Sequence, residues 1–85
     1  MKQNELNPAV EVYRRILDSI RQADYWERCS TPALCLVYWR QANGMARAAM
    51  IMTEDFLLCH RFFLIGQATI EKYNRLRDEH AERIF

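Results

Sequence analysis

Hydrophobic positions along the chain recur at helical spacing in three consecutive segments. The first segment alternates apolar and charged faces, whereas the second and third segments carry apolar residues around most of their circumference. Gly and Pro together account for only four residues. Because strands need frequent turns and a few long helices do not, the pattern predicts an all-α chain.

The first predicted helix covers residues 8–27. Asn7 is a suitable N-cap, and Pro8 suits the first helical position because its missing N–H would have no partner there. Apolar residues recur at steps of three and four, and the opposite face carries charged residues that include the pair Glu11 and Arg15. We therefore expect a half-buried helix at the surface.

The second predicted helix covers residues 32–52. Either Ser30 or Thr31 is its predicted cap, and Pro32 takes an early helical position. Arg40 and Arg47 are its only charged residues. A helix that is apolar over most of its circumference is expected to be buried on several sides.

Asn43 and Gly44 lie in the middle of this helix and allow two interpretations. Glycine in the left-handed conformation could end a helix at this point. The apolar pattern keeps its phase across the pair, however, so we favour one continuous helix and retain a break as the alternative.

The third predicted helix covers residues 54–83. Thr53 is its predicted cap, and the acidic residues Glu54 and Asp55 suit the positive end of a helix dipole. Its first half is strongly apolar, whereas the segment from Glu71 to Arg83 is strongly charged. We expect the first half to be covered by other elements and the second half to be solvated.

The length of 85 residues bounds the organisation to one domain. We predict a single helical domain over residues 1–85, with a flexible N-terminus at 1–6. Its fold class is all-α, a three-helix antiparallel bundle or hairpin.

Residues 33–70 are more apolar than one small bundle can cover. Monomers rarely expose apolar patches beyond about 300–600 Å², so we expect a second copy to complete the fold as a homodimer. A compact monomer with a crowded core is the alternative. The predicted contact residues are aromatic residues, methionines and arginines, which suit interfaces: Tyr38, Trp39, Arg40, Met45, Arg47, Met52, Phe56, Phe62 and Phe63.

Residue types that carry catalysis or bind metals are present but are spaced unsuitably. Cys29, Cys35 and Cys59 form no CxxC pair, and zinc sites need closely spaced ligand pairs. Cys59 and His60 are adjacent, so on a helix they point about 100° apart and do not face each other. We predict no catalytic residue, no metal site and no cofactor, and therefore no enzyme.

The net charge of +1 gives little support for nucleic-acid binding. A DNA-binding regulator remains the alternative function, with Arg40, Gln41, Asn43 and Arg47 as its contact residues. The longest uncharged run in the apolar middle, from Cys29 to Trp39, has eleven residues, and a membrane span needs roughly 20. We expect no membrane association and a cytoplasmic location, where the thiols stay reduced.

The pattern therefore predicts a function in protein–protein interaction. We expect a homodimer that binds and modulates another protein as an adaptor, a chaperone-like binder, or an inhibitor or anti-activator of a regulator. The sequence does not indicate the identity of that protein.

Overall fold

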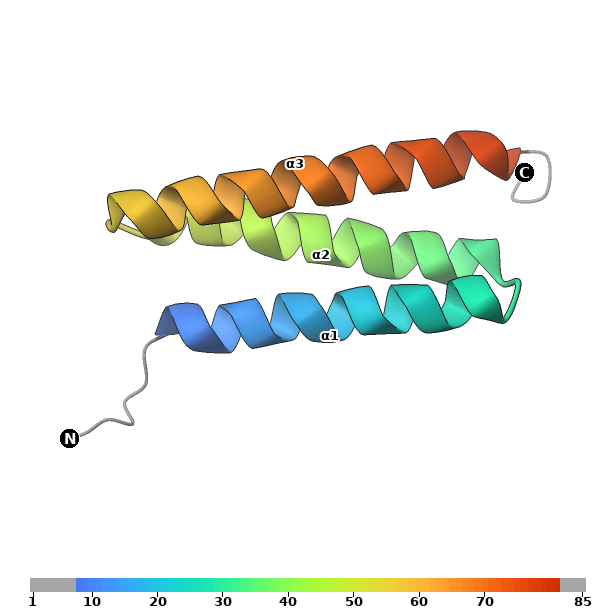
Figure 1. Cartoon of the computed structure of the whole chain (residues 1–85), viewed down its shortest axis with the longest axis horizontal. Coiled ribbons are helices and arrows are strands. Elements are labelled where there is room, and N and C mark those ends of the chain that lie inside the picture. The colour runs from blue at the N-terminus through green and yellow to red at the C-terminus, as the bar shows by residue number, and fades with distance from the viewer. Residues whose placement is uncertain (1–7, 82–85) are drawn as a thin grey trace.

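The computed structural model describes residues 8–81, which form three helices that run alternately in opposite directions (Figure 1). They are α1 (Pro8–Arg28), α2 (Pro32–Met52) and α3 (Phe56–Glu79). Residues 8–81 contain no strand. The predicted all-α class and antiparallel three-helix order are confirmed, whereas the segment 1–6 and the predicted cap Asn7 lie outside the described residues.

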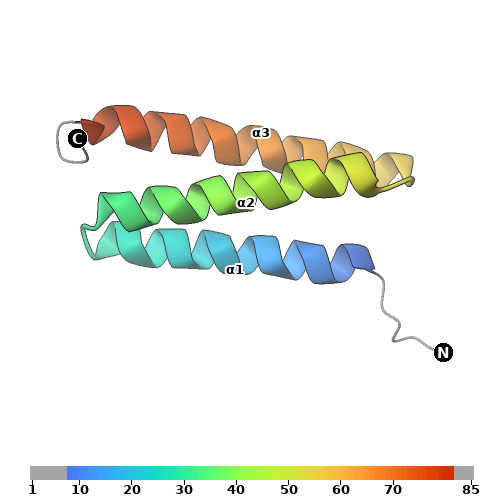
Figure 2. The same ribbon diagram turned by 180° about the vertical axis from the view of Figure 1, so that it is seen from behind.

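Helix α2 is the central helix of the arrangement. It packs along its length against both neighbours, whereas the backbones of α1 and α3 approach each other only marginally. Figures 1 and 2 show α2 between the other two helices from opposite sides. The Cα trace is accordingly elongated and shallow, with extents of 50 × 21 × 14 Å. Because α2 is covered on two sides, it carries apolar residues over a wide arc.

The core consists of two clusters along the length of α2. One cluster, toward the α1–α2 turn, contains Ala23, Cys35, Leu36, Trp39 and Leu76. The other cluster contains Ile16, Ala42, Ala46 and Phe62. The edge of the Tyr13 ring meets the Phe62 ring, with centroids 6.4 Å apart, and this contact links α1 to α3. The small alanines of α2 allow α1 and α3 to pack closely against it. The core between the helices therefore has few positions for large side chains.

Asn43 and Gly44 do not interrupt α2, which is continuous from Pro32 to Met52. Asn43 is buried, and its side-chain amide donates hydrogen bonds to the carbonyl oxygen of Gly66 at 2.8 Å and to Oγ1 of Thr69 at 3.3 Å. A buried amide must find partners or lose its hydration without compensation. These bonds explain why a polar residue can lie inside this apolar helix without ending it.

The α1–α2 turn follows a Schellman motif. The Thr31 N–H donates to the carbonyl oxygen of Trp26 and the Ser30 N–H donates to that of Glu27. Ser30 has a φ of 58°, in the left-handed region. Thr31 is the N-cap of α2, although its side chain makes no capping hydrogen bond, and Pro32 follows at the first helical position.

The α2–α3 turn differs from the sequence prediction. Helix α3 begins at Phe56 rather than at residue 54, because Asp55 caps it: the Leu58 N–H donates to Oδ1 of Asp55 at 3.1 Å. Thr53, the predicted cap, instead ends α2. Two capping residue types stand two positions apart here, and the carboxylate is the one that reaches the helix. Helix α3 ends at Glu79, and residues 82–83 lie outside the described residues.

Candidate interaction surface

The residues predicted to mediate contact lie in three environments. Arg40, Arg47, Met52, Phe56 and Phe63 are exposed, and Tyr38 and Met45 are partly buried. Trp39 and Phe62 lie in the core, with exposed fractions of 8% and 3%. These two aromatic residues therefore support the fold and do not form part of the surface of the single chain.

The large apolar side chains with the highest exposed fractions flank the α2–α3 turn at one end of the molecule. Ile51 and Met52 end α2, and Phe56 and Leu57 begin α3. Their exposed fractions are 76%, 80%, 82% and 71% in that order. We refer to these four residues as the apolar tip. Singly exposed apolar residues are ordinary, but a group at one turn marks a candidate contact site.

The local backbone of the turn explains why the tip points outward. The Thr53 N–H donates to the carbonyl oxygen of Ala49 at 3.0 Å, and the Asp55 N–H donates to Oγ1 of Thr53 at 3.3 Å. The polar residues of the turn thus satisfy its own backbone groups. Only three residues separate the helices, so the turn itself is too short to cover the four apolar side chains.

Exposed apolar residues continue from the tip along α3. Phe63 and Leu64 are 46% and 51% exposed. His60 lies between them and the tip, and its ring stacks on Phe63 with centroids 6.5 Å apart. Positions 56, 57, 60, 63 and 64 share one face of a helix because they recur at steps of three and four. Phe56 and Leu57 of the tip therefore continue into this face of α3, and the tip and the face together are the candidate surface.

Sequence reasoning missed Ile51, Leu57 and Leu64. A signal was present, because the apolar runs Met50–Ile51–Met52 and Phe56–Leu57–Leu58 bracket a turn of three polar residues. Such a turn is too short to cover both runs. Periodicity alone assigned these positions to an apolar helix without showing which of them the neighbouring helices would leave exposed.

A second exposed surface follows α2 on the side away from the core. We refer to Leu34, Val37, Gln41, Gly44 and Ala48, all of them exposed, as the outer stripe. These positions recur at steps of three and four, so they lie on one face of the helix. Arg40 and Arg47 are exposed beside this stripe, and Arg47 lines a shallow depression with Phe63 and Gln67 of α3.

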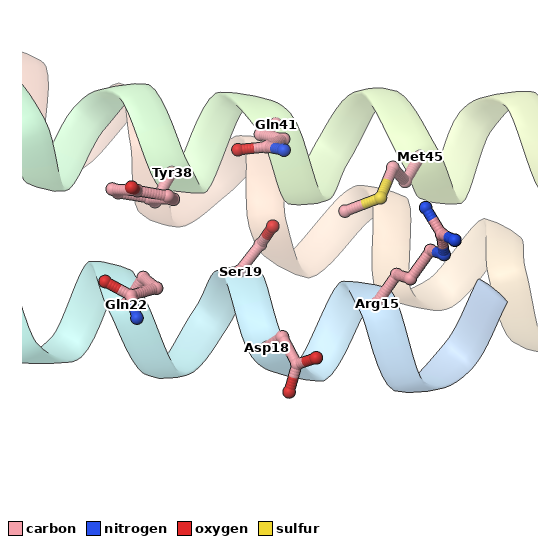
Figure 3. A pocket seen from close by; sticks show the side chains of 7 residues that line it. All are labelled: Arg15, Asp18, Ser19, Gln22, Tyr38, Gln41 and Met45. Carbon is pink, nitrogen blue, oxygen red and sulfur yellow. The ribbon is translucent and has the colours of Figure 1, made fainter. Parts of the chain in front are cut away.

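The polar depression between α1 and α2 offers no catalytic arrangement. Figure 3 shows Arg15, Asp18, Ser19 and Gln22 on α1 opposite Tyr38, Gln41 and Met45 on α2. Arg15 pairs with Glu11 at 3.2 Å, and Asp18 points away from α2 and pairs with Arg21 at 3.6 Å. The lining contains the hydroxyls of Ser19 and Tyr38 but no histidine or free carboxylate that could act as a general base beside them.

The residue types considered for metal binding or thiol chemistry are dispersed. Cys29 is exposed, Cys35 is buried and Cys59 is partly buried, and all three are unpaired. Burial raises the pKa of the Cys35 thiol, and the negative charge of Glu27 adds to this effect. Across residues 8–81, no three His, Cys, Asp or Glu side chains gather as a metal would require.

The DNA-binding alternative loses one of its contact residues in this geometry. Asn43 is buried and donates both of its side-chain hydrogen bonds within the protein, so its amide is not presented to a base edge. Arg40, Gln41 and Arg47 remain exposed. No helix of the described part of the chain has a stretch that is long and apolar enough to span a bilayer.

Comparisons with known proteins found no relative of this chain. No protein-family model matches the chain, and neither the curated proteins nor the solved structures include a significant match. The function of the protein is therefore inferred from the geometry of its surface.

Proposed function

We propose that the protein is a protein-interaction module that acts by binding rather than by catalysis, and that it self-associates through the apolar tip. One observation carries this proposal: four large apolar side chains at a single turn are each more than 70% exposed. Exposed apolar surface is unfavourable in water, and burying it drives association. The described residues offer no competing arrangement of catalytic groups.

The size of the exposed surface favours a second copy of the chain as its occupant. The surface consists of the tip together with Phe63 and Leu64. With about 200 Å² for each large side chain, their exposed fractions amount to about 800 Å², the area that each partner contributes to a standard interface. A two-fold axis would let the same surface cover itself.

The order of residues along α3 is compatible with such an axis near His60. In an antiparallel pair of α3 helices, Phe56 of one copy would face Leu64 of the other, and Leu57 would face Phe63. The apolar contacts of the two copies would thus agree on one register.

A cytoplasmic location is part of this proposal. Cys29 is exposed and unpaired, and Cys35 and Cys59 are also free thiols. Reducing compartments keep such thiols unpaired.

Site-specific photo-crosslinking of the purified protein tests this function. A benzophenone amino acid replaces Phe56 at the tip, and in a control protein it replaces Tyr25, an exposed aromatic residue in the last turn of α1. The end of α1 and the α2–α3 turn lie at opposite ends of the molecule (Figure 1). We expect position 56 to give a product of twice 10.2 kDa and position 25 to give little. Equal yields from both positions, or no product at position 56, would show that the tip makes no specific contact.

A further inference from the structure

The outer stripe of α2 has the composition of a helix-packing face, but no helix within residues 8–81 packs against it. Leu34 is 39% exposed and Val37 is 55% exposed. Gly44 and Ala48 follow in the same line, and a Cβ atom added to Gly44 would meet nothing within 4 Å. Small residues let a second helix approach closely, and large apolar residues at one end give it contact area. The stripe contains no charged residue.

Two arginines give this face a specific electrostatic character. Arg40 and Arg47 stand seven residues apart beside the stripe, and α2 contains no acidic residue. No carboxylate of residues 8–81 forms an ion pair with either guanidinium. On α1, Arg14 and Arg21 have the same spacing, but Glu11 and Asp18 pair with them at 3.7 and 3.6 Å. The cations of α2 are thus available to another molecule, whereas Arg14 and Arg21 of α1 already have carboxylate partners, one of which, Glu11, is shared with Arg15.

We propose that the outer stripe binds an amphipathic helix of another protein that carries acidic side chains along its flank. The apolar seam of that helix would lie on Val37, Gly44 and Ala48. Glutamate or aspartate residues on its flank would pair with Arg40 and Arg47, since residues seven apart lie on the same side of a helix. The inference rests on the proposed function, because it gives the chemistry of the protein that the module binds, but it uses a different surface from the apolar tip.

Charge distinguishes this occupant from a second copy of the chain. If two α2 helices packed antiparallel about Gly44, Arg40 of one copy would lie beside Arg47 of the other. Like charges at that distance oppose association, and α2 has no carboxylate to relieve them. The apolar character of the stripe likewise distinguishes a helix from DNA, because Leu34 and Val37 have no complement in a phosphate backbone.

Binding of two matched synthetic peptides to the full-length protein tests this inference. Both peptides are 21-residue helices with the same Leu and Ala seam; one carries Glu along its flanks and the other carries Lys at the same positions. Surface ion pairs are individually weak, so two pairs in the one complex and two like-charge contacts in the other predict that the Glu peptide binds about tenfold more tightly than the Lys peptide. Added salt should weaken this preference because the pairs are exposed.

Three variants assign the effect to the stripe. The double substitution Arg40→Glu/Arg47→Glu should reverse the preference toward the Lys peptide. The control Arg14→Glu/Arg21→Glu makes the same change in charge at the same spacing on α1 and should leave the preference toward the Glu peptide. Gly44→Leu should weaken the binding of both peptides about tenfold or more, because the added side chain blocks the close approach of the peptide helix. Circular dichroism should show an unchanged helix content, because the added side chain meets open space.

The opposite results would overturn the inference. They are binding of neither peptide, equal binding of both, or loss of the preference in the α1 control. Binding of a mixed-sequence DNA duplex that disappears in Arg40→Glu/Arg47→Glu would instead assign the arginines to nucleic acid. The crosslinking at position 56 is independent of all these arms, so failure of the peptide test and failure of the tip proposal can be told apart.

Discussion

The side-chain amide of Asn43 in α2 donates a 2.8 Å hydrogen bond to the backbone carbonyl oxygen of Gly66 in α3. Gly66 is buried beside Asn43, Ala46 and the stem of Arg47, so α2 and α3 pack closely at this point. Thr69 accepts a second hydrogen bond from the same amide. A buried polar contact of this kind fixes the register of two helices whose apolar surfaces alone would permit sliding.

Replacement of Asn43 by alanine should therefore destabilise the protein. We expect a loss of about 1–3 kcal/mol, since the buried Thr69 loses a partner and a small cavity forms. Urea unfolding followed by circular dichroism measures the effect. Gln41→Ala, on the exposed side of the same helix, is the control and should change stability by less than about 0.5 kcal/mol. Equal midpoints for the two variants would contradict the role of the buried amide.

Replacement of Ser30 by glycine should stabilise the protein. Ser30 occupies the left-handed region with a φ of 58°, where a residue with a Cβ atom is strained by roughly 1–2 kcal/mol. The greater freedom of glycine in the unfolded chain offsets part of this relief, so we expect a gain of about 1 kcal/mol. Thermal unfolding of Ser30→Gly and Ser30→Ala should show a higher midpoint for glycine; an unchanged or lower midpoint would refute the assigned turn.

Truncation of two adjacent phenylalanines on α3 should lower the stability by very different amounts. Phe62 is 3% exposed and fills one core cluster, whereas Phe63 is 46% exposed. We expect Phe62→Ala to cost about 3–5 kcal/mol and Phe63→Ala to cost less than about 1 kcal/mol, measured by urea unfolding at a concentration low enough for the monomer. Comparable losses would mean that the face we assign to the surface is in fact covered.

The three cysteines should react with an alkylating reagent in the order of their exposure. Cys29 is exposed, whereas Cys35 is buried and its pKa lies above the ordinary value of 9.0, because burial disfavours the thiolate. Mass spectrometry of timed samples should therefore show Cys35 modified last, and all three modified together in denaturant. Early labelling of Cys35 in the folded protein would show that its cluster opens readily.

The same raised pKa of Cys35 has a consequence for stability at high pH. Above about pH 9 the unfolded thiol releases its proton while the buried thiol retains it. The unfolded state then binds fewer protons, so stability falls as pH rises from this point until the folded thiol also ionises. The contribution is fully present below that range and should not change near neutral pH.

The sequence was sufficient to predict the helices, because Pro8 and Pro32 mark two starts and the apolar spacing runs unbroken through Asn43 and Gly44. It was less successful at the start of α3, where Thr53 and Asp55 are both good caps and only the folded geometry selects Asp55. The distinction depends on a single hydrogen bond to the Leu58 N–H. Local preference cannot resolve two candidates that lie two residues apart.

The candidate surface was predicted in part. Met52, Phe56 and Phe63 were selected from the sequence and are exposed, whereas Trp39 and Phe62 were selected and lie in the core. On a helix that is apolar over most of its circumference, periodicity does not show which side faces its neighbours. The shallow arrangement, with α2 in the middle, decides that question, and it depends on contacts between distant segments.

Sedimentation equilibrium tests the central claim, that the apolar tip is a contact surface, most directly. From micromolar to submillimolar concentration, the wild-type protein should approach twice its mass of 10.2 kDa. Phe56→Asp/Leu57→Asp should remain at the monomer mass with unchanged helix content, because both side chains are exposed, and Tyr25→Asp at the opposite end should behave like the wild type. A wild-type protein that stays at the monomer mass over the whole range, or a tip variant that still dimerises, would contradict the account.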